Sequence, residues 1–484
     1  MISLACAFLP LIGSLLLVIP AFRGRAALGV VFGVSLLETL TAFAAVAVRV
    51  PEAPEYSLER FMVLDATSAL FLLLISVVFL GISIYFLNQP TGVALPVPGP
   101  DRHLAMRSLL FFSCSIFAVL SNHLVSMWIF LELGTFAIAP LICQDNRPAG
   151  LRASWKYLLF SVIGLGFNFL GLLCLARAMG GSHGHHELTF FIDDLNQVTT
   201  LGDPLWWRLG MALIVFGLGT KLGLAPMYAW LPDAYDEAPA AITTMMTAVQ
   251  SNCVILALFR QVGLLRSFDP GLISEELIMM GAVSIGVAGL HIIRADNFKR
   301  LICYASINHA GTIALGLGSG KYAAYGVVLY VVSNALVKSV LFLTGGNIEN
   351  HYGTKRIFAL RGLMRVMPFS APAFMLGVFA LLGFAPFGSF LGEVMMLSNM
   401  IEEGHLLGFF FVCIMLTIIL MATGRALFPM IWGDAPEGGT PARDPFSSNV
   451  ACLFFVVILV SLGIYMPSPV SSLLREVATT LGGR

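Results

Sequence analysis

Apolar runs about as long as a lipid bilayer is thick recur along this chain, and they limit the folds it can adopt. The hydrocarbon core of a bilayer is roughly 30 Å across, which a helix of about 20 residues spans. Inside it, only helices and closed barrels satisfy their backbone hydrogen bonds. The runs predict an all-α integral membrane protein with about fourteen transmembrane helices, at approximately 2–21, 27–48, 62–88, 104–121, 123–143, 155–179, 207–228, 239–261, 274–293, 299–318, 321–345, 368–400, 405–431 and 449–467.

The composition agrees and excludes other classes of protein. Of 484 residues, 58% are hydrophobic and 11% are charged, whereas a soluble protein has about 25% charged residues. Lysine plus arginine and aspartate plus glutamate number 27 each, so no excess of positive charge favours a nucleic-acid partner. The eight cysteines include no C-x-x-C pair, which argues against a disulfide, zinc or iron–sulfur framework. No basic segment precedes the first run and no cleavage site follows it, so it is predicted to be a span and not a signal peptide.

The basic residues between the spans predict the orientation of the chain. Sixteen fall in loops or near the ends of spans on one side and nine on the other, and the richer side is expected to be cytoplasmic. An even number of spans then puts both termini on the outer, periplasmic side of a cell inner membrane. The two remaining basic residues, Lys221 and Lys338, lie well inside predicted spans.

Two loops are notable, although neither is long enough to form a soluble domain. The loop at about 180–206 contains Ser-His-Gly-His-His-Glu at 182–187. Clustered histidines can bind a metal, but a polar external loop is the favoured interpretation. The segment 434–447 has mixed charge, glycine and proline, and is predicted to be a cytoplasmic connector.

A short motif occurs twice in the chain. Gly-Leu-Ala-Pro ends at Pro226 in the seventh span, and Gly-Phe-Ala-Pro ends at Pro386 in the twelfth. An acid follows each proline by seven positions, Asp233 in the first copy and Glu393 in the second. Proline interrupts a helix, and non-helical backbone at membrane depth must be buried in protein or line a watery cavity.

The two copies are five spans apart, which pairs spans four to eight with spans nine to thirteen. An odd offset inverts the second copy, so two inverted five-helix repeats with broken helices seven and twelve are predicted. Chance recurrence of a Gly/Pro motif in apolar helices is the alternative. The expected organisation is a three-helix segment, the first repeat, the second repeat, and a last helix with a tail, at 1–103, 104–263, 274–432 and 433–484.

Ionisable residues inside the spans are costly, and each one is a candidate for function. Glu132 in the fifth span and Lys221 in the seventh have no opposite charge on their own helix. They are expected to pair with each other across helices. Such a pair can store and release a proton, or it can be a static structural ion pair.

Further ionisable groups follow in chain order and suggest a proton relay along the membrane plane. His309 lies in the tenth span, Lys338 in the eleventh and Glu393 in the broken twelfth. For His309 alone, a hydrogen-bonded core histidine is an equally good interpretation. Asp65, near the start of its span, is expected to cap it. Glu38 has no identifiable partner in the sequence.

No pattern in the chain indicates enzyme chemistry. There is no G-x-G-x-x-G after a strand, no Walker loop, no metal-spaced Cys/His set and no nucleophile motif. Any redox centres would therefore belong to other subunits of a complex.

The stretch around the first proline resembles the seventh-helix signature of the antiporter-like subunits of respiratory complex I. Its form is most similar to the F component of hydrogenase-4-type membrane-bound nickel–iron hydrogenases. Agreement extends from about 104 to 400 and is weaker outside that range. The matching segments are GTKLGLAPM at 219–227, WLPDA at 230–234, EAP at 237–239, ASWKY at 153–157, FKRL at 298–301, YASINH at 304–309, KSVLF at 338–342, YGTKRI at 352–357 and PFG at 386–388.

The resemblance implies a fourteen-helix fold with inverted repeats and periplasmic termini. It makes Glu132 and Lys221 the controlling ion pair, with Lys338, His309 and Glu393 on the exit side of a central hydrophilic axis. It also implies a larger assembly, with other membrane subunits and a peripheral redox arm that carries nickel–iron and iron–sulfur centres. The stretch after about 467 is too short for the long lateral helix of the distal complex I subunit.

Three positions depart from the family pattern. Asn252 stands where many antiporter-like subunits carry a lysine, Asn308 where hydrogenase-type subunits have a glutamate, and Asn334 where a histidine often precedes the Lys338 position. A neutral amide neither holds nor releases a proton near pH 7, although water can bridge the route past Asn252. These departures put full pumping in doubt.

Three functions remain open. The first is a proton-translocating, or sodium-translocating, subunit of a complex I-like, hydrogenase-4-type redox complex. The second is a cation/proton antiporter subunit of a complex without redox partners. The third is a membrane scaffold whose proton relay has degenerated.

Overall fold

The computed structural model describes residues 2–482 except 20–21, 23, 50–53, 89–100, 145–146, 180–189, 198–202, 267–268 and 435–445. The His-rich segment 182–187 and most of the predicted connector at 434–447 lie outside the described residues. The first half of the chain contains α1 (Ile2–Leu16), α2 (Arg25–Arg49), β1 (Glu55–Ser57), β2 (Met62–Leu64), α3 (Ala66–Asn88), α4 (Asp101–Leu120), α5 (Leu124–Ile142), α6 (Pro148–Met179), α7 (Ile192–Leu195), α8 (Pro204–Leu222), α9 (Leu231–Glu237), α10 (Ala240–Thr244), the π-helix η1 (Met245–Gln250) and α11 (Ser251–Arg266). The second half contains α12 (Pro270–Ile292), α13 (Phe298–Gly318), the 3₁₀-helix η2 (Lys321–Ala323), α14 (Ala324–Tyr352), the 3₁₀-helix η3 (Ile357–Ala359), α15 (Leu363–Val366), α16 (Ser370–Leu381), α17 (Gly388–Glu402), α18 (Leu406–Trp432), α19 (Phe446–Ile464) and α20 (Ser468–Gly482).

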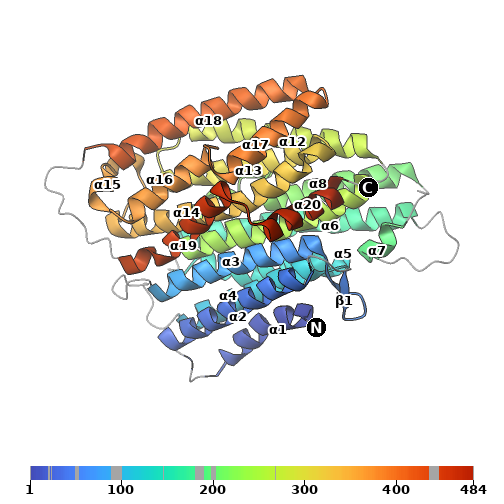
Figure 1. The fold of residues 1–484 in the computed structure, drawn as a ribbon, viewed down its shortest axis with the longest axis horizontal. Helices are drawn as coiled ribbons and strands as arrows, with labels where there is room; N and C mark the ends of the chain where they lie inside the picture. Colours follow the sequence, from blue (N-terminus) through green and yellow to red (C-terminus); the bar gives the residue numbers. More distant parts are fainter. Residues whose placement is uncertain are drawn as a thin grey trace.

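The long helices run side by side across the molecule, with α1 at one edge and α18 at the opposite edge (Figure 1). Within the described ranges, eleven helices are long and apolar enough to cross a membrane, or twelve if α19 and the bent α20 count as one span. Every predicted span coincides with a helix or with a pair of helices around a break. The all-α membrane fold is confirmed, whereas the exact number of fourteen spans stays a prediction.

Burial decides which helices can hold polar side chains. The apolar window of α14 is buried along its whole length, and those of α13 and of the span 240–266 are 94% buried, whereas that of α18 is only 17% buried. The inner helices therefore contact other helices and not lipid, and these neighbours can form hydrogen bonds with polar side chains. The outer helices present their apolar faces to the bilayer.

Both helices that were predicted to break do so at the repeated motif. The backbone leaves the helix between α8 and α9 around Pro226, and again between α16 and α17 around Pro386. The glycine three residues before each proline has a positive φ, +79° at Gly223 and +67° at Gly383, a backbone conformation that glycine adopts without penalty. The predicted breaks are confirmed, and the inverted repeat and the segment boundaries stay predictions.

The C-terminal stretch differs from the expected simple tail. It forms α20, which turns by 76° from α19 and buries Leu473, Leu474 and Val477 on one face. Apolar side chains at helical spacing explain this amphipathic helix. The beginning of α1 and the end of α20 lie at the same end of the bundle (Figure 1).

Candidate functional site

Lys221 occupies the last turn of α8, directly before the break, and is 4% exposed. Its ammonium donates a hydrogen bond to Thr135 Oγ1 on α5 and lies 5.0 Å from the centroid of the Tyr157 ring on α6. Both interactions compensate a buried cation. We refer to Thr135, Tyr157, Lys221 and Gln250 as the Lys221 cluster.

Gln250 connects the members of this cluster. Its Nε2 donates to Thr135 Oγ1 at 3.3 Å, while its Oε1 accepts from the Tyr157 hydroxyl at 2.7 Å. Gln250 ends the π-helix η1, and such π-turns inside α-helices are frequent at functional sites. The extra residue in the turn shifts the helical register, which changes the direction in which later side chains point.

Glu132 does not form the expected direct ion pair with Lys221. Its Oε2 is buried and accepts no hydrogen bond from any described residue, although the two charges are close enough to interact electrostatically. Thr135 lies one turn after Glu132 on the same face of α5, and it takes the place of the carboxylate as the acceptor for Lys221. The expected direct pair is therefore an indirect one.

Asn252 is 3% exposed in α11, two residues after the π-helix. Its amide donates to the carbonyl of Ala248 in the preceding turn, at 2.6 Å. The bond keeps the side chain along its own helix. No described side chain links Asn252 to the Lys221 cluster.

A second polar group surrounds His309 in α13. Nδ1 of the ring contacts Asn334 Oδ1 on α14, and Nε2 lies 3.3 Å from the carbonyl oxygen of Leu381 on α16. The Tyr330 ring packs against the imidazole with 5.4 Å between centroids, and the Tyr330 hydroxyl donates to Glu393 Oε1 at 3.1 Å. The structure thus brings the predicted His309 and Glu393 together through a tyrosine. We refer to His309, Tyr330, Asn334, Lys338 and Glu393 as the His309 cluster.

Lys338 stands one turn after Asn334 on α14 and is 5% exposed. Among the described residues, its ammonium makes no hydrogen bond or ion pair, but its charge acts on His309. Asn308, next to His309, is also buried, and its Oδ1 has no partner in the described part of the chain. A buried unpaired amide oxygen is costly, and it is a natural acceptor for a water molecule.

The second break positions Glu393. Leu381 precedes Gly383 by two residues, as Lys221 precedes Gly223, so a leucine stands at the position of the lysine in the second copy of the motif. The carbonyl oxygen of this leucine is the one that lies near His309. A Cβ added at Gly383 would lie 2.5 Å from Glu393 Oε2. The break therefore supplies both the acceptor for His309 and the space for the Glu393 carboxylate.

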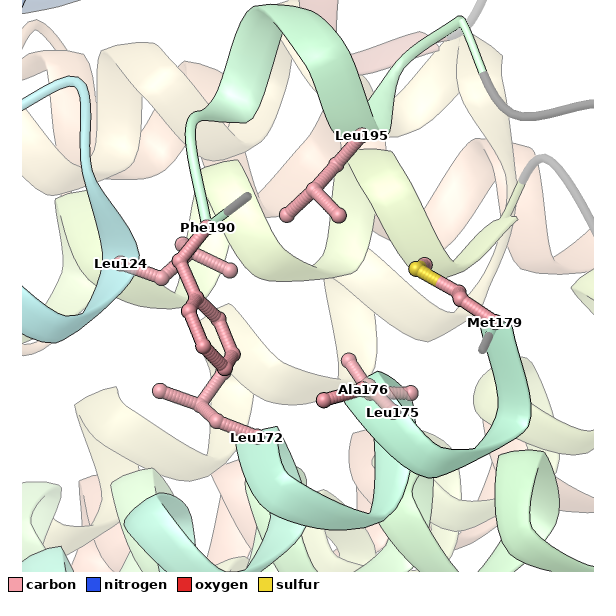
Figure 2. A pocket seen from close by; sticks show the side chains of 7 residues that line it. All are labelled: Leu124, Leu172, Leu175, Ala176, Met179, Phe190 and Leu195. Atoms are coloured by element: carbon pink, nitrogen blue, oxygen red, sulfur yellow. The ribbon is translucent and has the colours of Figure 1, made fainter. Parts of the chain in front are cut away.

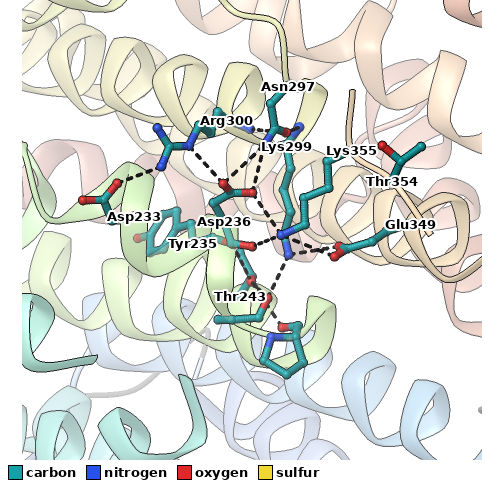
Figure 3. A network of polar contacts seen from close by, with 12 residues as sticks. Asp233, Tyr235, Asp236, Thr243, Asn297, Lys299, Arg300, Glu349, Thr354 and Lys355 are labelled. Atoms are coloured by element: carbon teal, nitrogen blue, oxygen red, sulfur yellow. Dashed lines mark hydrogen bonds and ion pairs between the residues drawn. The ribbon is translucent and has the colours of Figure 1, made fainter. Parts of the chain in front are cut away.

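Asp233, the acid of the first copy, belongs to a different set of residues. It lies in α9 and accepts from Lys156 on α6 at 2.7 Å and from Arg300 on α13 at 3.0 Å. Asp236, one turn later, contacts Arg300 at 2.9 Å and Lys355 at 3.2 Å. Figure 3 shows Arg300 between Asp233 and Asp236, and Lys355 beside Asp236. The acids at 233 and 393 thus match in sequence but differ in their surroundings.

The same network continues into α14. Glu349 Oε2 accepts from Lys299 at 3.2 Å, and its Oε1 accepts from Lys355 at 3.3 Å. Lys299 also donates to the carbonyl of Ala238 at 2.8 Å. These contacts tie the segment after the first break to the second half of the chain (Figure 3). We call it the Asp236 network: Lys156, Asp233, Asp236, Lys299, Arg300, Glu349 and Lys355.

Charge in the network shifts two ionisation equilibria. Burial opposes ionisation of Asp236, but Lys355, Arg300 and Lys299 outweigh it and hold the pKa of the carboxyl below its usual value. Burial also opposes protonation of Lys355, but Glu349 and Asp236 outweigh it and raise the pKa of that ammonium. Both groups are therefore charged over the whole physiological pH range.

Asp65 has the structural role that was predicted for it. Its Oδ1 accepts from the backbone N–H of Ser68 at 2.8 Å and so caps α3. The same oxygen also accepts from Arg260 on α11 at 3.1 Å, a partner that the sequence did not indicate.

A cavity lies between α5, α6 and α7, and the side chains that line it are apolar (Figure 2). It is formed by Leu124, Leu172, Leu175, Ala176, Met179, Phe190 and Leu195. No polar side chain is among the described residues that line it, so these residues offer no chemistry for a charged or polar ligand. The described residues also contain no group of three His, Cys, Asp or Glu side chains that could hold a metal ion.

Sequence reasoning missed Thr135, Tyr157, Gln250 and Tyr330. Their signal was a hydroxyl or amide side chain inside an apolar span, which is common and therefore unspecific. Only their mutual contacts across helices distinguish them from other serines, threonines and tyrosines of the spans.

A family model described as NADH:quinone oxidoreductase/Mrp antiporter, TM, matches residues 121–419. The chain is 26% identical to the hydrogenase-4 component F homolog of Methylacidiphilum infernorum over 421 residues, which cover 84% of this chain and 86% of that relative. It is 26% identical to the putative antiporter subunit mnhD2 of Staphylococcus aureus over 370 residues, 76% of this chain and 73% of that one. It is 30% identical to the N component of the NADH-quinone oxidoreductase of Desulforudis audaxviator over 288 residues, 59% and 56% of the two chains.

Solved structures agree over the whole chain. A chain of the membrane-bound sulfane sulfur reductase, an archaeal respiratory membrane complex, superposes with a TM-score of 0.88 at 24% identity, covering 99% of this chain and 98% of that one. A chain of the Mrp complex from Dietzia sp. DQ12-45-1b superposes with a TM-score of 0.86 at 19% identity, covering 99% and 96%. At these identities the structures establish the fold alone.

Proposed function

Because the chain belongs to the NADH:quinone oxidoreductase/Mrp antiporter transmembrane family, we propose that it moves protons across the membrane as one subunit of a larger complex. The observation that carries this proposal is Lys221, a buried lysine at a helix break whose ammonium is bonded to a neutral hydroxyl. Because its bonded partner is a hydroxyl and not a carboxylate, this lysine can lose its proton without leaving a buried negative charge unpaired. Sodium is the alternative ion.

The first step of the proposal concerns the Lys221 cluster. Losing a hydrogen bond to a charged group costs about 1.5–3 kcal/mol. One elementary charge moved through 100 mV of membrane potential is worth about 2.3 kcal/mol. The Lys221–Thr135 contact is therefore weak enough for the driving force to break. When Lys221 turns from Thr135 to the unpartnered Glu132 Oε2, the carboxylate stabilises the charged lysine, and when it turns back the proton is released more readily.

The second step concerns the His309 cluster. His309, Tyr330 and Glu393 form a contact series in which each member can donate or accept a proton or a hydrogen bond. Lys338 lies beside this series without a bonded partner among the described residues. We propose that Lys338 receives the proton and that the series leads it towards Glu393.

The connection between the two clusters needs water. Asn252 donates only within its own helix, so it does not replace a titratable lysine. The unpartnered Asn308 Oδ1 is a ready acceptor for a bridging water. We propose that hydrogen-bonded water passes Asn252 and Asn308, and that the two inverted repeats each contribute one cluster.

The Asp236 network gives the proposal its mechanical link. It joins α9, directly after the first break, to α13 and α14, which hold His309 and Lys338. A movement of the backbone at the first break would therefore displace the helices that hold the His309 cluster. We place this network on the cytoplasmic side of a cell inner membrane, and both termini on the periplasmic side, on the basis of the distribution of lysine and arginine.

The partner complex is proposed to be of the hydrogenase-4 type, with nickel–iron and iron–sulfur centres in subunits other than this one. The hydrogenase-4 component F homolog supports this assignment, because the similarity covers 84% of this chain. The similarity to a putative antiporter subunit over 76% of the chain supports the second candidate, a cation/proton antiporter subunit without redox partners.

Purification from the native membrane in mild detergent, with mass spectrometry of the co-purifying chains, separates the two candidates. Nickel–iron hydrogenase-like and iron–sulfur subunits would support the redox complex. Recovery of multispan antiporter subunits alone would contradict it.

The same complex then serves to test translocation. In reconstituted vesicles, Lys221→Met and Lys338→Met should each reduce proton movement by about tenfold or more. Arg475→Gln, at an exposed position on α20, is the matched control and should keep full activity. Full translocation by Lys221→Met, in a complex of normal composition, would contradict the mechanism and favour a scaffold with a degenerate relay.

A further inference from the structure

Glu38 lies halfway along α2 and is completely buried. Neither of its carboxyl oxygens has a hydrogen-bond partner among the described residues. No other described carboxyl group has both of its oxygens buried and unpartnered. It is also outside both clusters described above, since α2 lies next to α1 at the edge of the molecule opposite α17 and α18 (Figure 1).

In the part of the chain that the structure describes, the helices that pack against α2 bring no positive charge to this carboxyl. From α1, the facing titratable group is the thiol of Cys6, whose Sγ points to Thr41 Oγ1 at 3.5 Å. α3 contains no Lys, Arg, His, Asp or Glu. The charged residues of α4 lie in its first two turns, within Asp101–Arg107, and Arg102 is bonded to the carbonyls of Leu17 and Val18.

The neighbouring hydroxyl groups are committed elsewhere. Ser35 and Ser83 bond each other at 2.7 Å, Thr39 donates to the carbonyl of Ser35 at 2.7 Å, and Thr41 donates to the backbone carbonyl of Glu38 at 2.8 Å. None of these bonds reaches the carboxyl group. An ionised carboxylate that has no counter-charge among the described residues, and only the weakly donating thiol of Cys6 facing it, is very costly in such surroundings.

We propose that Glu38 is a proton-binding site: its carboxyl group holds a proton in the packed interface of α1 and α2, separate from the Lys221 and His309 clusters. The site lies close to the outer surface of the protein. Leu37 and Leu40, the neighbours of Glu38 on α2, are 49% and 58% exposed. A lipid-soluble reagent can therefore approach α2 from the bilayer.

Dicyclohexylcarbodiimide tests the proposal, because it reacts with protonated carboxyl groups in apolar surroundings. The carboxyl proton moves to a carbodiimide nitrogen, the carboxyl oxygen bonds the central carbon, and the adduct rearranges to a stable N-acylurea. Cleavage after Arg25 and Arg49 releases residues 26–49, in which Glu38 is the sole acidic residue. A mass adduct on this peptide therefore reports Glu38 directly.

The whole complex in native membranes should give the adduct, with a yield that falls as the pH rises. Glu38→Gln keeps the size of the side chain and should reduce the adduct on this peptide to background. Infrared spectroscopy gives a second readout that needs no reagent: wild type minus Glu38→Gln should show the carbonyl stretch of a protonated carboxylic acid. Absence of both the adduct and the band would overturn the proposal.

Sodium provides a further decisive arm. If the adduct is unchanged when sodium replaces potassium, the site binds a proton. Protection by sodium would assign the carboxylate to a metal cation and overturn the proposal. Lys221→Met should lose translocation and still be labelled at Glu38, so the outcome at this site is independent of the proposed function.

Discussion

Lys221 on α8 donates its hydrogen bond to Thr135 on α5, one helical turn beyond the carboxylate of Glu132. The hydroxyl separates two charges that were expected to touch. A direct buried ion pair is difficult to open, because each partner would be left as an unpaired charge. The indirect arrangement keeps the lysine satisfied in one position and leaves a second acceptor within electrostatic reach.

Thr135→Val should impair translocation while preserving the shape of α5. The substitution removes the acceptor of the Lys221 hydrogen bond, which should cost about 1.5–3 kcal/mol at a charged donor. We expect proton movement in vesicles to fall by about tenfold. Thr135→Ser keeps the hydroxyl and should retain most of the activity. Equal activity of the valine and serine variants would show that the contact is incidental.

Alanine at the glycine of either break should lower stability, and the two variants should differ in their effect on translocation. Both glycines have positive φ, so each substitution should cost about 1–2 kcal/mol of stability. At Gly223 the new Cβ would meet Leu231 Cδ1 at 2.4 Å, whereas at Gly383 it would meet Glu393 Oε2 at 2.5 Å. Thermal stability in detergent should therefore fall in both variants.

Translocation separates the two variants. Gly383→Ala should displace the Glu393 carboxylate from Tyr330 and reduce proton movement beyond what the loss of stability explains. Tyr330→Phe, which removes the same hydrogen bond, should reproduce this loss without the strain. If Tyr330→Phe is fully active, the Glu393 contact has no part in transport.

Asp236→Asn should weaken the link between the two halves of the chain. The variant removes a buried carboxylate shared by Arg300 and Lys355. Removing one partner of a buried ion pair costs on the order of 3 kcal/mol. The melting temperature of the purified complex should fall, and proteolysis near α9 should become faster. An unchanged melting temperature would contradict the proposed linking role.

The Asp236 network also predicts a pH dependence of stability. The ordinary pKa of this carboxyl is 3.8, and its pKa is lowered in the fold, so Asp236 stabilises the fold at pH values above 3.8. This contribution is lost as the pH falls through the lowered pKa. The ordinary pKa of this ammonium is 10.5, and its pKa is raised in the fold, so Lys355 stabilises the fold at pH values below 10.5. This contribution is lost as the pH rises through the raised pKa. The contribution of these two groups to the melting temperature should be constant between pH 3.8 and pH 10.5. The melting temperature should fall at more acidic and at more alkaline pH.

Two variants assign the limbs of this profile. Asp236→Asn should flatten the acid limb, and Lys355→Met should flatten the alkaline limb. An acid limb as steep in Asp236→Asn as in the wild type would assign the acid transition to other carboxylates.

The sequence alone determined where the helices lie and where two of them break. Span positions follow from the length of apolar runs, and the breaks follow from Gly and Pro, so both are local properties of the chain. The sequence also showed which groups within the spans are ionisable, since Lys221, Lys338 and Glu393 stand isolated in apolar runs. These features need no knowledge of which helices are neighbours.

Only the tertiary structure decided which polar groups meet. Lys221 and Thr135 are 86 positions apart in the chain, and their contact depends on the rotation of α5 and α8 about their own axes. Consecutive side chains on a helix of 3.6 residues per turn are about 100° apart. A rotation of α5 by less than this angle would have presented Glu132 to Lys221 in place of Thr135. The same holds for the π-turn that directs Gln250 and for the packing that isolates Glu38, because side-chain contacts between helices are set by packing and not by the hydropathy of either helix.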